Sequence, residues 1–183
     1  MTLMKSYPIL SAVVLGLALS FGGFVHAQDT NTDPAEGGAT IAFGDRKQDT
    51  DAPIDVTSER LAVDENANTA LFTGDVVVIQ DTMTLYAPWV KVFYKEDQSG
   101  ISHLKAKDGV TLLQNEEAAE GETADYDLEK EIIVMNGDVL VTQKLSAIAS
   151  DKMTVRLDEG TALMTGRVKS LLRTNTNSKK DGE

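Results

Sequence analysis

Apolar side chains recur at every second position through much of the chain between Pro53 and Leu172. Val90 and Val92, for example, alternate with charged or polar neighbours, and turn-forming sequences such as Asn136-Gly137 interrupt the alternation every few residues. A period of two is typical of strands with one buried face, whereas an amphipathic helix repeats at about 3.6 residues. The pattern therefore predicts an all-β fold of about 15–16 short antiparallel strands with no helix.

The predicted strands belong to a repeat of about thirty residues. Residues 58–76 and 150–168 align without gaps and share eight of nineteen positions, including the pairs Thr73-Gly74 and Thr165-Gly166. Gly74, Gly109, Gly137 and Gly166, spaced 35, 28 and 29 residues apart, occupy equivalent places and are called the marker glycines below. Stacked β-units of this kind bury one continuous apolar interior and leave open strand edges at both ends.

The alternation assigns one set of side chains to the inner face. Before the first marker glycine, Leu71 is out of step with Val76 and Val78, so we expect a β-bulge at the glycine where the strand switches sides. The register around these glycines is left open. The predicted inner set comprises Leu61, Val63, Val76, Val78, Val90, Val92, Val110, Leu112, Tyr126, Leu128, Val139, Val141, Met153 and Val155.

The chain outside this repeat differs in composition. Residues 1–27 predict a signal peptide, because Lys5 precedes an apolar run from Ile9 to Leu19 and Val25-His26-Ala27 offers a cleavage site. A membrane anchor is the alternative, but the stretch is interrupted by serines and glycines and falls short of about 20 strongly apolar residues. Residues 28–52 predict a flexible acidic leader, residues 53–172 the folded domain, and residues 173–183 a flexible tail.

Charge and composition narrow the function. Of 183 residues, 17 are basic and 29 acidic, giving a net charge of -12, which disfavours binding to nucleic acid phosphates. The absence of cysteine excludes disulfides, thiolate catalysis and attachment of lipid through cysteine.

The search for catalytic or metal-binding residues yields little. His103 has no partner at a recognisable motif spacing, and no glycine-rich phosphate loop is present. Asp125, Asp127 and Glu129 alternate with Tyr126 and Leu128, which fits the wet face of a strand better than a calcium loop. We therefore expect no enzyme activity, no metal and no cofactor.

Four segments carry a resemblance to a known family. Residues 53–59 (Pro-Ile-Asp-Val-Thr-Ser-Glu), 72–78 (Phe-Thr-Gly-Asp-Val-Val-Val), 124–127 (Ala-Asp-Tyr-Asp) and 135–139 (Met-Asn-Gly-Asp-Val) occur in the order typical of the LptA/OstA-like periplasmic lipopolysaccharide-transport proteins. The chain resembles that family over nearly all of residues 53–172. The resemblance implies a twisted, open β-jellyroll whose apolar groove binds the acyl chains of lipopolysaccharide.

The same resemblance implies the partners and the location. Such proteins stack head to tail in the periplasm and bridge an inner-membrane transporter complex and an outer-membrane assembly complex. The predicted inner set would then contact the lipid. Because the chain is acidic, affinity for anionic lipopolysaccharide would come mainly from burial of acyl chains. Lysines at positions such as 91, 95, 105, 107 and 152 either line a phosphate-binding rim or are ordinary solvated strand residues.

Two alternatives remain open. A structural or adhesive β-repeat module of the envelope would use the same inward valines and leucines to fill a dry core without a lipid ligand. A hydrolase of envelope glycans would need carboxylates such as Asp125 and Asp127 as its acid and base, which the sparse polar constellation supports least.

Overall fold

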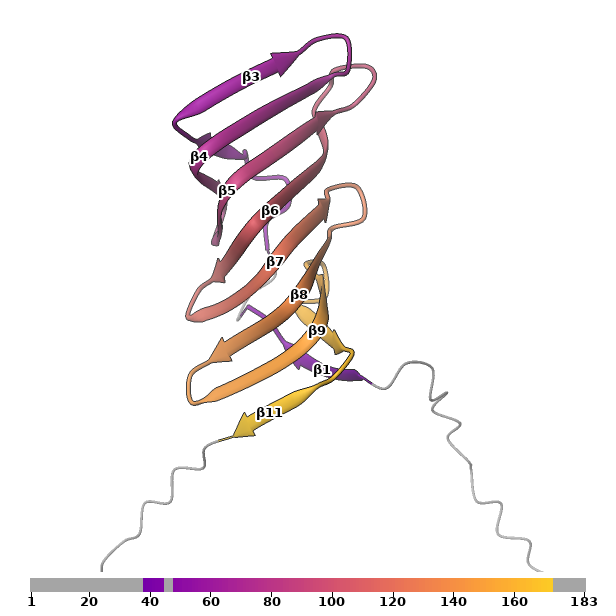
Figure 1. Cartoon of the computed structure of the whole chain (residues 1–183). Coiled ribbons are helices and arrows are strands. Elements are labelled where there is room, and N and C mark those ends of the chain that lie inside the picture. Colours follow the sequence, from indigo (N-terminus) through magenta and orange to yellow (C-terminus); the bar gives the residue numbers. More distant parts are fainter. Residues whose placement is uncertain (1–37, 45–47, 173–183) are drawn as a thin grey trace, which may run out of the picture. The chain divides into compact units, whose positions relative to one another are not determined.

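The alternating segments form one antiparallel β-sheet in a computed structural model that describes residues 38–44 and 48–172. The predicted signal peptide, the first part of the leader and the predicted tail lie outside the described residues. The described residues contain eleven strands (Figure 1): β1 Gly38–Ala42, β2 Asp55–Thr57, β3 Arg60–Asp64, β4 Thr69–Gln80, β5 Met83–Tyr94, β6 Ile101–Gln114, β7 Glu117–Asp127, β8 Ile132–Gln143, β9 Ser146–Arg156, β10 Thr161–Thr165 and β11 Lys169–Leu172.

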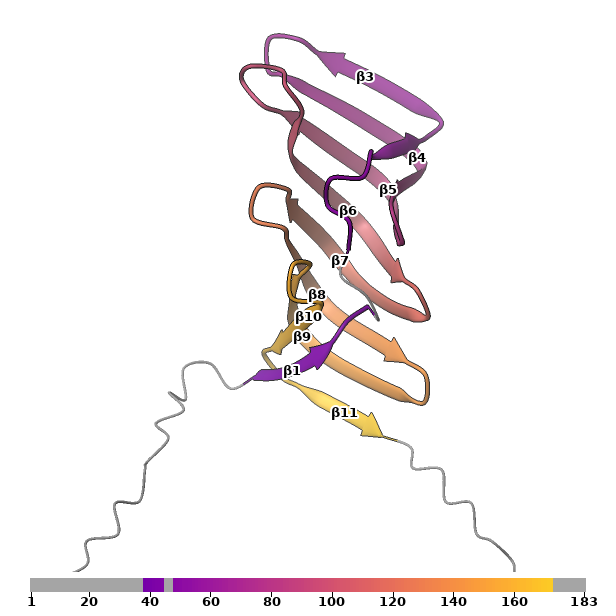
Figure 2. The same ribbon diagram turned by 180° about the vertical axis from the view of Figure 1, so that it is seen from behind.

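Strands β4 to β9 pair in sequence order, each with the next, as a meander of long hairpins. At one end of the sheet, β2 and β3 both pair with β4. At the other end, β10 and β11 both pair with β9, and β1 adds to β10 (Figure 2). The all-β, open jellyroll architecture predicted from the sequence is confirmed.

The predicted number of strands was too high. The central strands are 11 to 14 residues long because each continues through the position at which the sequence suggested a break. At Gly74 the pairing of β4 with β5 shifts between Thr73 and Val76, so that two residues of β4 lie opposite one residue of β5. Such a bulge bends the strand without ending its hydrogen-bonded ladder.

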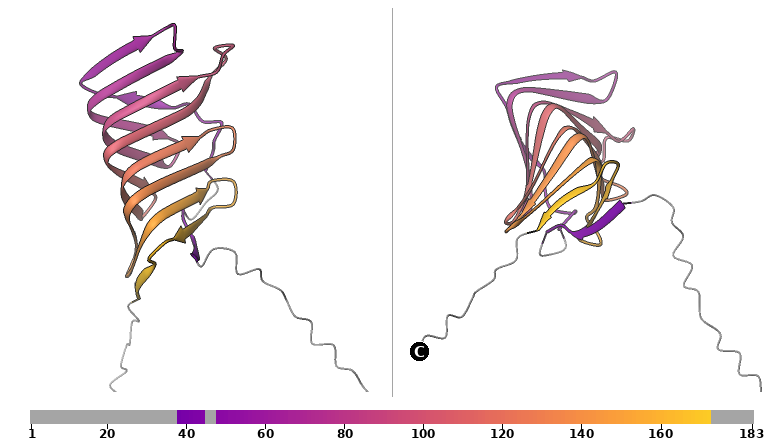
Figure 3. Two further views of the ribbon diagram at one scale, coloured as in Figure 1. Left: turned by 45° about the vertical axis from the view of Figure 1, so that its right-hand side comes forward. Right: turned by 60° about the horizontal axis from the view of Figure 1, so that its bottom comes forward.

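The bulges recur as a row across the sheet. Equivalent shifts occur at Gly109 in β6 and at Gly137 in β8. Gly74 has φ +82° and Gly137 has φ +84°, in the left-handed region where glycine avoids the steric cost of a side chain. The aligned bulges bend successive strands at the same level, and the sheet curves around an interior (Figure 3).

The bulges are confirmed, but the predicted switch of sides within β4 was wrong. Phe72 packs against the core before the bulge, and Val76 is buried after it, so the inward positions of β4 stay in step. The partner strand switches instead, since its inward residues Ala87 and Val90 are three positions apart. Where two residues of one strand lie opposite a single residue of its partner, the inward positions change from odd to even numbers, or the reverse, in only one of the two strands.

Residues 38–44 and 48–52, which belong to the predicted flexible leader, are ordered. Gly38–Ala42 forms β1, which pairs with β10 from Gly38 opposite Thr165 to Ala42 opposite Thr161. Phe43 is fully buried and donates its N–H to the carbonyl of Gly160 at 3.1 Å. Residues 28–52 were predicted to be flexible because most of them are polar. Ala39, Ile41 and Phe43 nevertheless alternate as in a strand, and their burial offsets the entropy lost when this segment is ordered.

Candidate functional site

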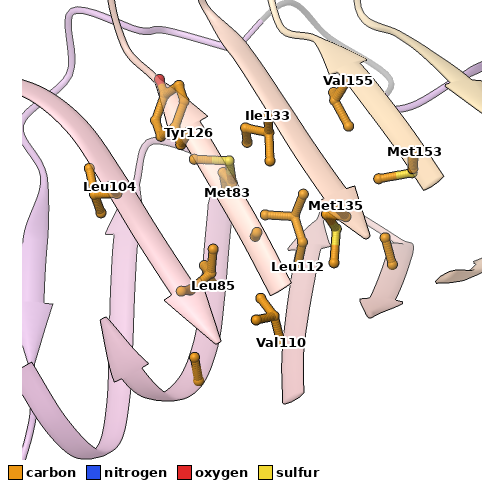
Figure 4. Close-up of a cluster of buried hydrophobic side chains, with 14 of the residues drawn as sticks. Met83, Leu85, Leu104, Val110, Leu112, Tyr126, Ile133, Met135, Met153 and Val155 are labelled. Carbon is orange, nitrogen blue, oxygen red and sulfur yellow. The ribbon is translucent and has the colours of Figure 1, made fainter. Parts of the chain in front are cut away.

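The candidate site is the apolar interior of the curved sheet. Inward side chains of neighbouring strands lie directly opposite one another and form rows across the sheet. One row runs from Val78 in β4 through Leu85 and Leu112 to Ala119 and Val141. Figure 4 shows side chains of both halves of the bent strands pointing into the shared interior. Rows of this kind arise because side chains alternate faces along every strand.

Most of the predicted inner set lies in this interior. Eleven of its members are at most 4% exposed: Val76, Val78, Val90, Val92, Val110, Leu112, Tyr126, Val139, Val141, Met153 and Val155. Leu128 is partly buried against the same cluster. The predicted inward face is therefore confirmed for these strands, and their contact with lipid stays a prediction.

Leu61 and Val63 differ from the rest of the set. They lie opposite Phe72 and Ala70 on the inner face, but β3 is an edge strand that has no neighbour beyond it among the described strands. They are 57% and 63% exposed as a result. The interior thus continues to the edge of the sheet as an uncovered apolar strip.

Several core residues were missed at the sequence level. Met83, Leu85, Leu104, Ile133, Met135 and Ile148 are all buried in the same cluster. Their signal was the same two-residue alternation. Leu104, Ile133 and Met135 precede the marker glycines of β6 and β8. The others lie in β5 and β9, which have no marker glycine and in which the inward positions change parity at the bulge.

A cavity in the described part of the interior is very small. The cavity between Val78, Leu104 and Ile133 is about 10 Å³, near the limit for holding one water molecule. An acyl chain does not fit in this cavity unless its walls move apart. Burial of the Tyr126 side chain in this wall raises its pKa to about 12, with a further contribution from the negative charge of Glu131.

A row of polar side chains borders the interior along the hairpins at one side. Gln80, Gln114 and Gln143 are the last residues of β4, β6 and β8. The Tyr126 hydroxyl donates to Oε1 of Gln80 at 3.0 Å, so this border is joined to the apolar wall. Gln80 and Gln114 are buried, and Oε1 of Gln114 is a buried acceptor without a hydrogen-bond partner in the described part of the chain.

Four of the five lysines considered for a phosphate-binding rim, at positions 91, 105, 107 and 152, lie on the outer face, whereas Lys95 lies between β5 and β6 and pairs with Glu129 at 3.2 Å. Lys91 separates the inward residues Val90 and Val92, and it lies opposite Lys105. Both ammonium groups lie over the Phe93 ring, at 5.3 and 5.9 Å from its centroid. Their position supports the reading as solvated outer-face residues with cation–π contacts.

The acidic strand segment is also on the outer face. Asp125 pairs with His103 and, at 3.3 Å, with Lys105. Asp127 pairs with Lys130, and this ammonium group lowers the pKa of the Asp127 carboxyl. In residues 38–44 and 48–172, no group of three or more His, Asp or Glu side chains is arranged to hold a metal ion. No helix among the same residues has the length and apolar character to cross a membrane.

The fold and the site together define an open antiparallel β-jellyroll with an apolar interior. The family model described as the LptA/(LptD N-terminal domain) LPS transport protein matches residues 55–161. The chain therefore belongs to this family.

Individual relatives agree with this assignment. The chain is 30% identical over 117 residues to the lipopolysaccharide export system protein LptA of Escherichia coli K12, a match covering 61% of this chain and 63% of that protein. An uncharacterized protein of Rhizobium meliloti is 29% identical over 120 residues, covering 61% of this chain and 64% of the relative. The chain thus spans less than two thirds of the length of these curated relatives.

A solved structure matches the fold. The crystal structure of LptH from Pseudomonas aeruginosa, the LptA-homologous periplasmic component of the lipopolysaccharide transport device, superposes with a TM-score of 0.63. The match has 17% sequence identity and covers 69% of this chain and 99% of LptH. At this identity the likeness concerns the β-jellyroll itself.

Proposed function

We propose that the chain is a periplasmic lipopolysaccharide-binding bridge protein, which carries lipopolysaccharide from an inner-membrane transporter complex toward an outer-membrane assembly complex. The observation that supports this most is the continuous apolar interior, which runs from strand to strand and reaches the exposed edge residues Leu61 and Val63. The core of a closed globular domain is covered on all sides, whereas this interior is exposed at β3, where a further strand could pair.

The acyl chains of lipopolysaccharide occupy the interior in this proposal. Burial of apolar area contributes about 25 cal/mol per Å² and does not depend on protein charge, which suits an acidic chain and an anionic ligand. The membership in a transport family and the lipopolysaccharide-related names of its relatives support the same substrate.

Photo-crosslinking in cells tests the lipid site. A photo-reactive side chain at Val78 or Val141 should capture lipopolysaccharide, because both positions face the interior. One at Val77 or Leu140, the neighbouring positions on the outer face, should capture little. Equal capture at Leu140 and Val141 would contradict the interior as the binding site, and no capture at any position in a folded, transport-competent protein would contradict lipid binding.

Lipid content distinguishes this function from the alternatives. Mass spectrometry of the protein purified natively from its own envelope should show stoichiometric lipopolysaccharide. A purely structural module would be free of lipid, and a glycan hydrolase would be free of lipid and turn over a glycan.

A further inference from the structure

The polar border of the interior makes an unusual set of contacts with the N-terminal part of the chain. Gln80, Gln114 and Gln143 end every second strand along one side, and the side-chain amide of each donates to the segment before β2. Gln143 donates to the carbonyl of Ala42 at 2.5 Å, and Gln114 donates to Oε1 of Gln48 at 3.3 Å. We call the described residues 42–44 and 48–52 the N-terminal strap.

Of the three glutamines, Gln80 makes the most hydrogen bonds with the strap. Its side-chain amide donates to the carbonyls of Thr50 and Ala52, at 2.9 and 3.1 Å. The Gln48 amide donates in return to the backbone carbonyl of Gln80 at 2.5 Å. Because Oε1 of Gln80 also accepts from Tyr126, a single glutamine joins the strap to a residue that lines the cavity.

The strap therefore lies over one border of the apolar interior. Figure 2 shows its two described pieces on the concave side of the sheet, one following β1 and the other leading to β2. The first piece is fixed by the buried Phe43 and by the N–H of Gly44, which donates to the carboxylate of Glu117 at the β6–β7 hairpin. The second is fixed by Gln48 and Thr50, the latter donating to Glu131 at 2.9 Å.

The chemistry of these contacts suits a reversible closure. Apart from Phe43, the strap is bound by hydrogen bonds, and groups of this type exchange protein partners for water at a small net cost. A wall that is permanent relies on interlocked apolar side chains, as the sheet itself does. In addition, none of the described residues of the strap donates a hydrogen bond to the buried Oε1 of Gln114.

We propose that the N-terminal strap is an internal closing segment of the lipid site, which covers the glutamine border in the empty protein and leaves it when lipopolysaccharide enters. The proposal rests on the proposed function for the identity of the ligand. The cavity of about 10 Å³ requires the interior to open for any acyl chain, and the strap is the part of its border bound mainly by side-chain amides. Departure of the strap frees the three glutamine amides to bind polar groups of the incoming lipid.

Hydrogen exchange of the full chain, with and without purified lipopolysaccharide, tests the strap directly. In the empty protein the amides of Phe43 and Gly44 are hydrogen-bonded and should exchange slowly. Loading should accelerate their exchange at least tenfold, while ladder amides of β6 and β8 stay protected. Bound lipopolysaccharide is quantified by co-elution in the same samples.

The outcomes separate this proposal from the proposed function. Loading with unchanged or slower exchange at Phe43 and Gly44 would overturn the strap proposal and leave lipopolysaccharide binding intact. Failure to load at all would overturn both.

A variant gives a second measurement. Gln80→Leu keeps the side-chain size but removes the donors to Thr50 and Ala52, so uptake of fluorescently labelled lipopolysaccharide should be several-fold faster than in the unaltered chain. Thr142→Val, on the outward-facing position beside Gln143, is the matched control and should load at the unaltered rate. Slower uptake by a folded Gln80→Leu protein would show that the strap is a necessary wall and would contradict its release.

Discussion

At the scale of single residues, two marker glycines distinguish the stability cost of an unfavourable backbone conformation from the cost of a side-chain clash. Gly109 and Gly137 both have positive φ, at +96° and +84°, but only Gly137 has a neighbour, the side chain of Glu122, where a Cβ would lie. Gly109→Ala should therefore cost about 1–2 kcal/mol from backbone strain alone. Gly137→Ala should cost more, because Glu122 must also move. Denaturant midpoints of the two variants measure the difference, and equal losses would show that the contact is without effect.

Tyr126 gives the fold a dependence on alkaline pH. Its pKa is about 12 in the folded protein against 10.0 for an ordinary tyrosine, so the native state holds the hydroxyl proton more tightly. This contribution is complete below pH 10 and is lost as pH rises through 12, up to about 2–3 kcal/mol. Tyr126→Phe should lose about 1 kcal/mol at neutral pH with the hydrogen bond to Gln80. Stability curves between pH 8 and 12 should fall less steeply for this variant, and parallel curves would contradict the assignment.

At the scale of the strand, neighbouring positions of β8 should differ in how much stability they lose when a charge is introduced. Val141 is fully buried, whereas Leu140 is 38% exposed on the other face. Val141→Asp should cost about 3 kcal/mol or more, because a carboxylate there is desolvated without a partner, and Leu140→Asp at most about 1 kcal/mol. Burial would raise the pKa of the new carboxyl, so the Val141→Asp penalty should shrink in acid as the group takes up a proton. Similar denaturant midpoints for both variants would contradict the inward assignment.

The strands also show what a local pattern predicts and what it does not. Alternation correctly assigned Val139 and Val141 to the interior, because burial of one face acts on each strand separately. It overestimated the strand number, since a bulge at Gly74 interrupts the pattern in sequence while the ladder continues in space. The strap was missed for a different reason. Gln48 and Thr50 are polar, and their partners Gln80 and Glu131 lie 32 and 81 residues away, so no local signal marks them.

At the scale of the whole molecule, the two ends of the sheet remain open within the described part of the chain. β3 pairs only with β4, and β11 pairs only with β9. Unpaired edges of this kind attract further strands, and the two ends are different surfaces, so contact between them is heterologous and propagates. We therefore expect head-to-tail association, with the apolar strip of Leu61 and Val63 as one half of the contact.

A matched pair of substitutions on β3 tests this association. Val63 is exposed on the inner face, whereas Ala62 lies opposite Leu71 on the outer face. Val63→Lys should weaken association by at least tenfold, because a joined interior would have to desolvate the ammonium group. Ala62→Lys adds the same charge one residue away and should associate as before. Light scattering over a wide concentration range measures both. A monomer at every concentration for the unaltered chain would contradict head-to-tail growth. If both variants lost association equally, the cause would be charge at the strand edge, and a continuous apolar interior between copies would be contradicted.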